Sequence, residues 1–138
     1  MWRYPFSAKA AASVLVLASL LFSGCGGGDD VERYHVSGKV TFRNQPIPAG
    51  TIIFEPDASK GNSGPQGFAE IKNGEFNTQL TGKGTVGGPH RITVEGTDGI
   101  AKDEGNAAGS PLFPPYTTTI DLPKETTQQD IEVIDFSR

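Results

Sequence analysis

Short β-branched and aromatic runs, separated by turn-forming residues, constrain the fold of this 138-residue chain more than any other feature. Many of its 18 Gly and 10 Pro residues fall between these runs, together with Asn and Asp. Helices need longer segments with an apolar residue every three or four positions, and such segments are nearly absent after residue 30. The pattern therefore predicts an all-β fold, an antiparallel sandwich.

Seven segments have the composition of strands. Asn73-Gly74 separates the third from the fourth, and this pair tolerates positive φ angles at both turn positions, which predicts a tight hairpin. The longest irregular segment runs from Thr97 to Pro115, and loops of that length are usually functional or mobile. The predicted strands are residues 33–42, 51–54, 67–71, 75–80, 90–95, 116–122 and 128–136.

Alternation within these strands predicts which side chains share a face. In the fifth strand, Ile92 and Val94 should face the core while the residues between them face water. In the last strand, Ile131 and Val133 face one way, and Glu132, Ile134 and Phe136 face the other.

The first 24 residues have the organisation of a secretory signal. Arg3 and Lys9 give a basic start, and Ala10 to Phe22 is an uncharged apolar run. This run has 13 residues, whereas crossing about 30 Å of hydrocarbon takes about 20 residues in a helix. We therefore expect residues 1–24 to be a signal peptide, not a permanent transmembrane helix.

Cys25, the only cysteine, follows this segment directly. The residues Leu21-Phe22-Ser23-Gly24-Cys25 resemble the lipobox of bacterial lipoproteins, although Phe22 stands where that family usually has Leu. The resemblance implies cleavage before Cys25 and a lipid on its thiol, so that acyl chains such as palmitate anchor the protein in a membrane. The alternative is an ordinary cysteine behind a non-lipoprotein signal.

The charge balance limits the partners of the remaining chain. Of 12 basic residues, Arg3 and Lys9 lie in the signal, whereas all 16 acidic residues lie beyond it, which leaves a formal charge of about −6. An acidic domain without a Lys/Arg cluster is not a nucleic-acid binder.

Residues 25–32 form a short glycine-rich tether that holds the domain, residues 33–138, close to the membrane. Gly26, where the lipoprotein family has Asp for inner-membrane retention, favours the outer membrane or cell surface.

Four motifs stand out in the domain: Val36-Ser37-Gly38-Lys39-Val40-Thr41-Phe42, residues 45–56, Asn73-Gly74-Glu75-Phe76, and Gly88-Pro89-His90-Arg91-Ile92-Thr93-Val94. They resemble those of the small β-sandwich domains called carboxypeptidase regulatory-like or transthyretin-like, which occur in short bacterial surface lipoproteins, especially of planctomycetes. The resemblance implies a seven-stranded Ig-like or prealbumin-like antiparallel sandwich. His90 replaces the tyrosine usual in the last motif, so this corner is expected to pack differently. These motifs are signatures of a fold and imply no catalytic group.

Transthyretin-related hydrolases share this fold but use several histidines, an arginine and a Tyr-Arg-Gly-Ser terminus. This chain ends Asp135-Phe136-Ser137-Arg138 and has only His35 and His90, both expected to lie exposed on the polar faces of strands. It also has no Gly-x-Ser-x-Gly nucleophile motif. We therefore expect no enzyme, no catalytic residue and no cofactor, although a cleft that joined His35 to His90 would favour a hydrolase.

Two further segments contain residue types that bind ions. Asp98, Asp103 and Glu104 share the long loop, and Ca²⁺ prefers carboxylate oxygens, but their spacing fits no calcium-loop signature. Residues 82–85, Gly-Lys-Gly-Thr, lack the spacing of a phosphate-binding loop and precede no helix. Solvated carboxylates and an ordinary turn are the expected outcomes, with no metal site.

The surface segment that best suits a ligand is Phe113-Pro114-Pro115-Tyr116, because a rigid proline-aromatic segment can dock a glycan or a peptide. Alternatively, Leu112 and Phe113 fold back to cover a sheet edge. We expect a non-catalytic, lipid-anchored module that binds an envelope protein or polysaccharide, with Phe113 and Tyr116 as possible contacts. A purely structural envelope component and a small hydrolase remain alternatives, since a fold does not specify a function.

Overall fold

The structure, a computed structural model, describes residues 30–137. The predicted signal peptide, Cys25 and most of the tether lie outside the described residues. Within them are nine strands and one turn of 3₁₀ helix, and no α-helix. The strands are β1 (Val36–Phe42), β2 (Gln45–Pro46), β3 (Ala49–Pro56), β4 (Gly67–Lys72), β5 (Glu75–Asn77), β6 (Gly88–Thr97), β7 (Tyr116–Leu122), β8 (Thr127–Gln128) and β9 (Ile131–Val133), with η1 (Ala58–Lys60) after β3.

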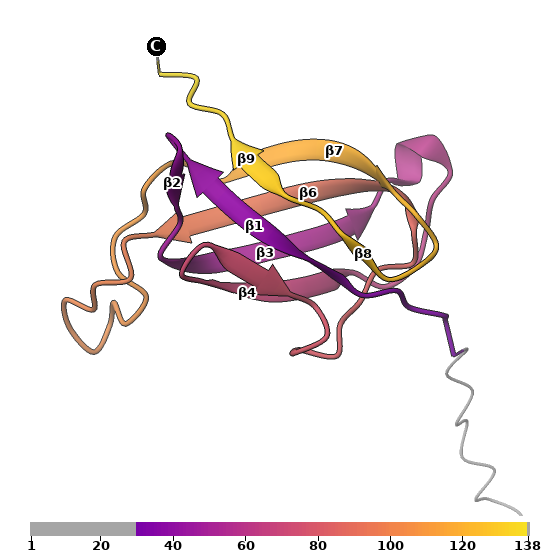
Figure 1. The fold of residues 1–138 in the computed structure, drawn as a ribbon, viewed down its shortest axis with the longest axis horizontal. Helices are drawn as coiled ribbons and strands as arrows, with labels where there is room; N and C mark the ends of the chain where they lie inside the picture. The colour runs from indigo at the N-terminus through magenta and orange to yellow at the C-terminus, as the bar shows by residue number, and fades with distance from the viewer. Residues whose placement is uncertain (1–29, 138) are drawn as a thin grey trace, which may run out of the picture. The chain divides into compact units, whose positions relative to one another are not determined.

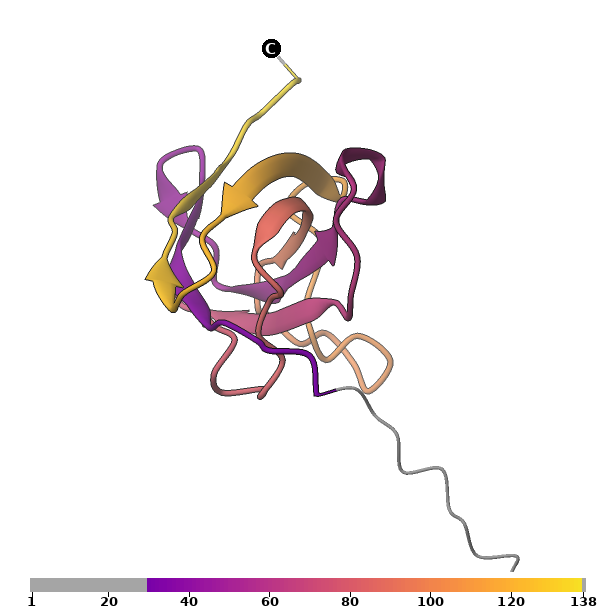
Figure 2. The same cartoon turned by 90° about the vertical axis from the view of Figure 1, so that its right-hand side faces the viewer.

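The strands form one curled, mainly antiparallel sheet (Figure 1). Its order is β2-β1-β5-β4-β3-β6-β7, and β8 and β9 both pair with β1. The central strand β3 pairs with β4 over six residues and with β6 over eight. Seen from the side, the strands wrap around a common interior (Figure 2). The all-β class predicted from the sequence is confirmed.

Every one of the seven predicted segments contains a strand. The predicted hairpin is confirmed, because Ile71 pairs with Phe76 across a turn in which Asn73 and Gly74 have φ angles of 51° and 77°. β2 is an addition to the seven predicted segments. The residues 98–115 contain no strand, in agreement with the predicted long loop.

The C-terminal strand differs from the prediction. Residues 128–136 were expected to form one antiparallel strand, but the chain forms two short strands, β8 and β9, and both run parallel to β1. Between them the backbone of Gln129 passes over Gly38, where a Cβ atom would lie 2.0 Å from the Gln129 carbonyl oxygen. The amide of Gln129 donates to the Ser37 carbonyl oxygen at 2.8 Å. The crossing thus needs a residue without a side chain at position 38.

Alternate positions of the strands supply the core. Phe54 is fully buried and its ring packs 5.8 Å from that of Phe76. The predicted faces of the last segment are confirmed in part by burial, since Ile131 and Val133 are buried whereas Ile134 and Phe136 are exposed. The buried apolar side chains are Val36, Val40, Ile47, Ile52, Phe54, Ala69, Ile71, Phe76, Ile92, Val94, Leu122, Ile131 and Val133.

The prediction of an exposed His90 was wrong. His90 lies two residues before Ile92 and four before Val94, so the strand alternation turns all three inward, and His90 is fully buried. Its Nδ1 donates to the Gly88 carbonyl oxygen at 2.9 Å, and its Nε2 has no hydrogen-bond partner. His35 is half-buried, with Nδ1 3.5 Å from the Thr78 hydroxyl oxygen. Neither imidazole stands free on a polar face.

Candidate functional site: an aromatic groove

A groove of about 380 Å³ opens where β1 ends and β7 begins. One wall comes from the proline-aromatic segment and the start of β7, and the other from the chain that follows β9. We call it the aromatic groove. Its lining residues are Phe42, Phe113, Pro114, Pro115, Tyr116, Thr117, Val133, Ile134, Asp135, Phe136 and Ser137.

Phe113 is held in the wall by packing on the sheet. A Cβ atom on Gly96 would lie 2.7 Å from the Phe113 ring, so glycine at this position makes room for the ring. On its other side the ring packs against Phe42, with the centroids 4.7 Å apart. Leu112 donates its amide to the Gly96 carbonyl oxygen at 2.9 Å, which fixes the loop beside β6. Phe113 therefore folds back onto the sheet and also forms part of the groove, whereas Leu112, which the same alternative expected to fold back with it, is 38% exposed.

Tyr116 and Phe136 meet across the groove. Tyr116, the first residue of β7, is half-buried, and its ring stacks on that of Phe136 with a centroid separation of 6.4 Å. Phe136 itself is 80% exposed and Ile134 is 55% exposed. Two large apolar side chains thus lie open to solvent next to a preformed concave surface, an arrangement typical of binding sites.

An ion pair holds Asp135, one of the residues that line the aromatic groove. The Arg43 guanidinium, which also lies over the Phe42 ring, contacts the Asp135 carboxylate at 2.6 Å. The other Asp135 oxygen accepts hydrogen bonds from the hydroxyl and the amide of Ser137. These hydrogen bonds, first those from Ser137 and then that from Arg43, lower the pKa of Asp135 from 3.8 to about 2. They fold the end of the chain back as the second wall of the groove.

Acid should release this wall. Because the folded pKa of Asp135 lies below its unfolded value, the stabilisation from its ionised form is complete above about pH 4 and is lost as pH falls through about 2. A ¹³C NMR titration of the Asp135 carboxyl carbon should therefore have its midpoint near 2. Ser137→Ala, which removes the largest single contribution, should move the midpoint towards 3.8. Equal midpoints near 3.8 in both proteins would contradict the docked geometry.

The aromatic groove and the N-terminal end of the described chain lie at opposite ends of β1. The chain reaches β1 at Val36, whereas Phe42, the last residue of β1, lines the groove. Figure 1 shows β1 running from the side where the chain begins to the side where β9 and the C-terminus lie. At about 3.3 Å per residue the strand separates the two ends by about 20 Å.

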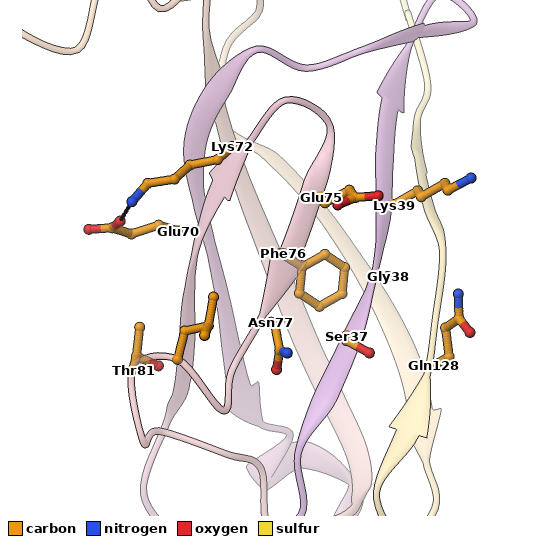
Figure 3. A pocket seen from close by; sticks show the side chains of 11 residues that line it. Ser37, Gly38, Lys39, Glu70, Lys72, Glu75, Phe76, Asn77, Thr81 and Gln128 are labelled. Carbon is orange, nitrogen blue, oxygen red and sulfur yellow. Dashed lines mark ion pairs between the residues drawn. The ribbon is translucent and has the colours of Figure 1, made fainter.

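A second and larger groove, of about 610 Å³, lies over β1, β4 and β5 (Figure 3). Its charges balance, since Lys72 pairs with Glu70 at 2.8 Å and Lys39 lies directly across the strands from Glu75. Leu80, 86% exposed, lies on its rim. Exposed, mutually paired charges on a sheet face are typical of a solvated surface and bind little by themselves.

The acidic residues of the long loop organise that loop. One Asp98 oxygen accepts hydrogen bonds from the amides of Ile100 and Ser110, and these bonds lower the pKa of Asp98. The bond from Ser110 also joins the two ends of the loop. The Asp103 carboxylate accepts a hydrogen bond from the Gly105 amide. Within residues 30–137 no three His, Cys, Asp or Glu side chains gather closely enough to hold a metal ion.

The two histidines line neither the aromatic groove nor the charged groove over β1, β4 and β5. The sequence singled out Phe113 and Tyr116, and both line the aromatic groove. It missed Phe42, Phe136 and the Arg43–Asp135 pair. The available signal was the exposed face of the last segment, because two large apolar residues there, Ile134 and Phe136, face away from the core.

Comparisons with known proteins add no relative. Models of protein families, curated proteins and solved structures all give no match to this chain. In the part of the chain that the structure describes, no helix is long and apolar enough to cross a membrane. The function must therefore be inferred from the residues and the geometry of the site.

Proposed function

We propose that this protein is a lipid-anchored cell-envelope module that captures an envelope partner in the aromatic groove and catalyses no reaction. The observation that carries the proposal is the exposure of Phe136 and Ile134 beside a concave surface already lined by Phe42, Phe113 and Tyr116. Exposed aromatic side chains on a rigid support are the side chains that dominate binding energy at interfaces. Cys25 carries the lipid, at the outer membrane or the cell surface.

The same proposal includes a finer assignment of the fold. We infer a prealbumin-like sandwich of the carboxypeptidase regulatory-like kind, with seven principal strands. Three residues of the motifs support it: Gly38 lies under the Gln129 crossing, Gly74 has the positive φ of the hairpin turn, and Phe54 is in the core. Each of these positions restricts the residue type for a physical reason, which explains why the motifs have these residues there.

The anchor and the groove suit this function together. A lipid on Cys25 would hold the start of β1 near the bilayer, because only a short tether lies between them. The aromatic groove lies at the other end of β1, about 20 Å along the strand from its start. A partner would be met in the space beyond the lipid surface, in agreement with an envelope protein or polysaccharide and not with a lipid ligand.

Phe136→Ser is expected to abolish capture without unfolding the domain, because the side chain is exposed. A photo-crosslinking amino acid in place of Ile134, introduced in the native cells, should give adducts with an envelope component that Phe136→Ser removes. Leu80→Ser is the matched control, since Leu80 is equally apolar and is 86% exposed but lies outside the aromatic groove. The proposal fails if Phe136→Ser leaves the adducts unchanged or if Leu80→Ser removes them equally.

A further inference from the structure

The outer edge of β7 has no partner strand. β7 pairs with β6 along one edge over all seven residues from Tyr116 to Leu122. Among residues 30–137, no strand pairs with its other edge and no loop backbone hydrogen bond reaches it. Every second residue of β7 therefore directs an amide and a carbonyl group away from the sheet. Such an edge is a template for an added strand.

β4 is a strand of this sheet whose exposed edge is covered. The edge of β4 that β5 leaves free is closed by the following loop, where the Phe68 amide donates to the Lys83 carbonyl oxygen and the Thr81 hydroxyl donates to the Phe68 carbonyl oxygen. β7 lacks such a cover and has no lysine, proline or bulge within it, the usual means of blocking an edge. Its sequence, Tyr-Thr-Thr-Thr-Ile-Asp-Leu, is rich in residues that favour strands.

The free edge is continuous with the aromatic groove, because Tyr116 and Thr117 belong to both. The lining of the groove is mainly apolar, and its polar side-chain groups are the Asp135 carboxylate and the hydroxyls of Tyr116, Thr117 and Ser137. The carboxylate is already satisfied internally, since one Asp135 oxygen is held by Arg43 and the other by Ser137. A sugar ring needs hydrogen-bonding side chains for its hydroxyl groups, whereas an extended peptide uses the backbone edge for its polar groups and the groove for its apolar side chains.

We propose that the partner's contact is an extended peptide segment that adds to the outer edge of β7 and places apolar side chains in the aromatic groove. The inference rests on the proposed function and names the chemistry of its ligand. Pro115 and Pro123 bracket β7, so the added strand has about seven residues, or roughly 23 Å. Alternate residues of the peptide face the groove, and the residues between them face solvent.

Hydrogen exchange of the β7 amides tests this directly. The probe is a synthetic peptide, selected for binding from a displayed library of random nine-residue sequences. The selection target is the full chain carrying Cys25→Ser, which lacks the lipid and is studied in solution. In the free protein, NMR should show alternation, with slow exchange for amides that face β6 and fast exchange for those between them. Saturating peptide should slow the fast set at least about tenfold. Uniformly slow exchange in the free protein, or no slowing with peptide, overturns the inference.

Groove variants separate this inference from the proposed function. Phe136→Ser should weaken binding of the selected peptide at least about tenfold, while Leu80→Ser leaves it unchanged. If the library yields no peptide whose binding depends on Phe136, but soluble fragments of envelope polysaccharide bind in a Phe136-dependent way, the peptide inference is overturned and the proposed function stands. If neither probe depends on Phe136, both fail.

Discussion

Gly38→Ala should lower the free energy of unfolding by about 3 kcal/mol or more, a large share of the stability of a domain of this size. The new Cβ atom would lie 2.0 Å from the Gln129 carbonyl oxygen and 2.6 Å from its carbonyl carbon. This backbone cannot move aside cheaply, because Gln129 donates to the Ser37 carbonyl oxygen and Asp130 accepts the Lys39 amide at 2.9 Å. Pairing of β8 and β9 with β1 should be lost first.

Urea unfolding followed by circular dichroism measures this effect. Gly105→Ala is the matched control, since its Cβ atom would meet only the Asp103 carboxylate at 3.4 Å, an ordinary contact, and its stability should stay within about 0.5 kcal/mol of the parent. The smallest cost of overpacking is on the order of 1 kcal/mol. If the unfolding free energy of Gly38→Ala differs from that of the parent by less than about this amount, β8 and β9 do not pack on β1 in this way.

Cys25→Ser should move the protein from the membrane fraction to the soluble fraction. Each buried methylene of an acyl chain contributes about 0.8 kcal/mol, so two or more chains anchor a protein of this size stably. Intact-mass spectrometry of the parent, extracted from its native membrane, should give a chain that begins at Cys25 and carries acyl groups.

Ser23→Ala provides the control for this experiment, because it keeps a small residue before the cleavage position and should leave lipidation intact. A parent chain cut elsewhere and free of lipid would overturn the anchor. Cys25 would then be a free thiol in a secreted or periplasmic domain. The aromatic groove would be unaffected by that outcome, since it rests on residues of the folded domain.

The positions of the strands were predictable because short-range patterns set them. Alternation identified β1, β6 and β7, and the Asn73-Gly74 pair set the β4–β5 turn. The pairing of β8 and β9 with β1 was not predictable in the same way. It depends on a contact between Gly38 and Gln129, 91 residues apart, for which neither sequence segment carries a local signal.

About half of the candidate site was predictable from the sequence. Phe113 and Tyr116 were singled out from one segment, but the second wall comes from residues after β9, and only the fold brings Phe136 within 6.4 Å of Tyr116. The error at His90 had a different cause. His90 shares its strand face with Ile92 and Val94, so the alternation of the strand already places it inward, and only its polar ring suggested exposure.

The opposite placement of the chain's beginning and the aromatic groove along β1 also has a mechanical consequence. If the lipid holds the start of β1 and a partner holds the groove residues that follow β9, a pulling force passes from β1 to its neighbouring strands. β1 is bonded to β5 on one side and to β8 and β9 on the other, with hydrogen bonds that lie roughly across the direction of pull. Such bonds are loaded in shear and must break together, not one after another, so the domain would resist extension between membrane and partner.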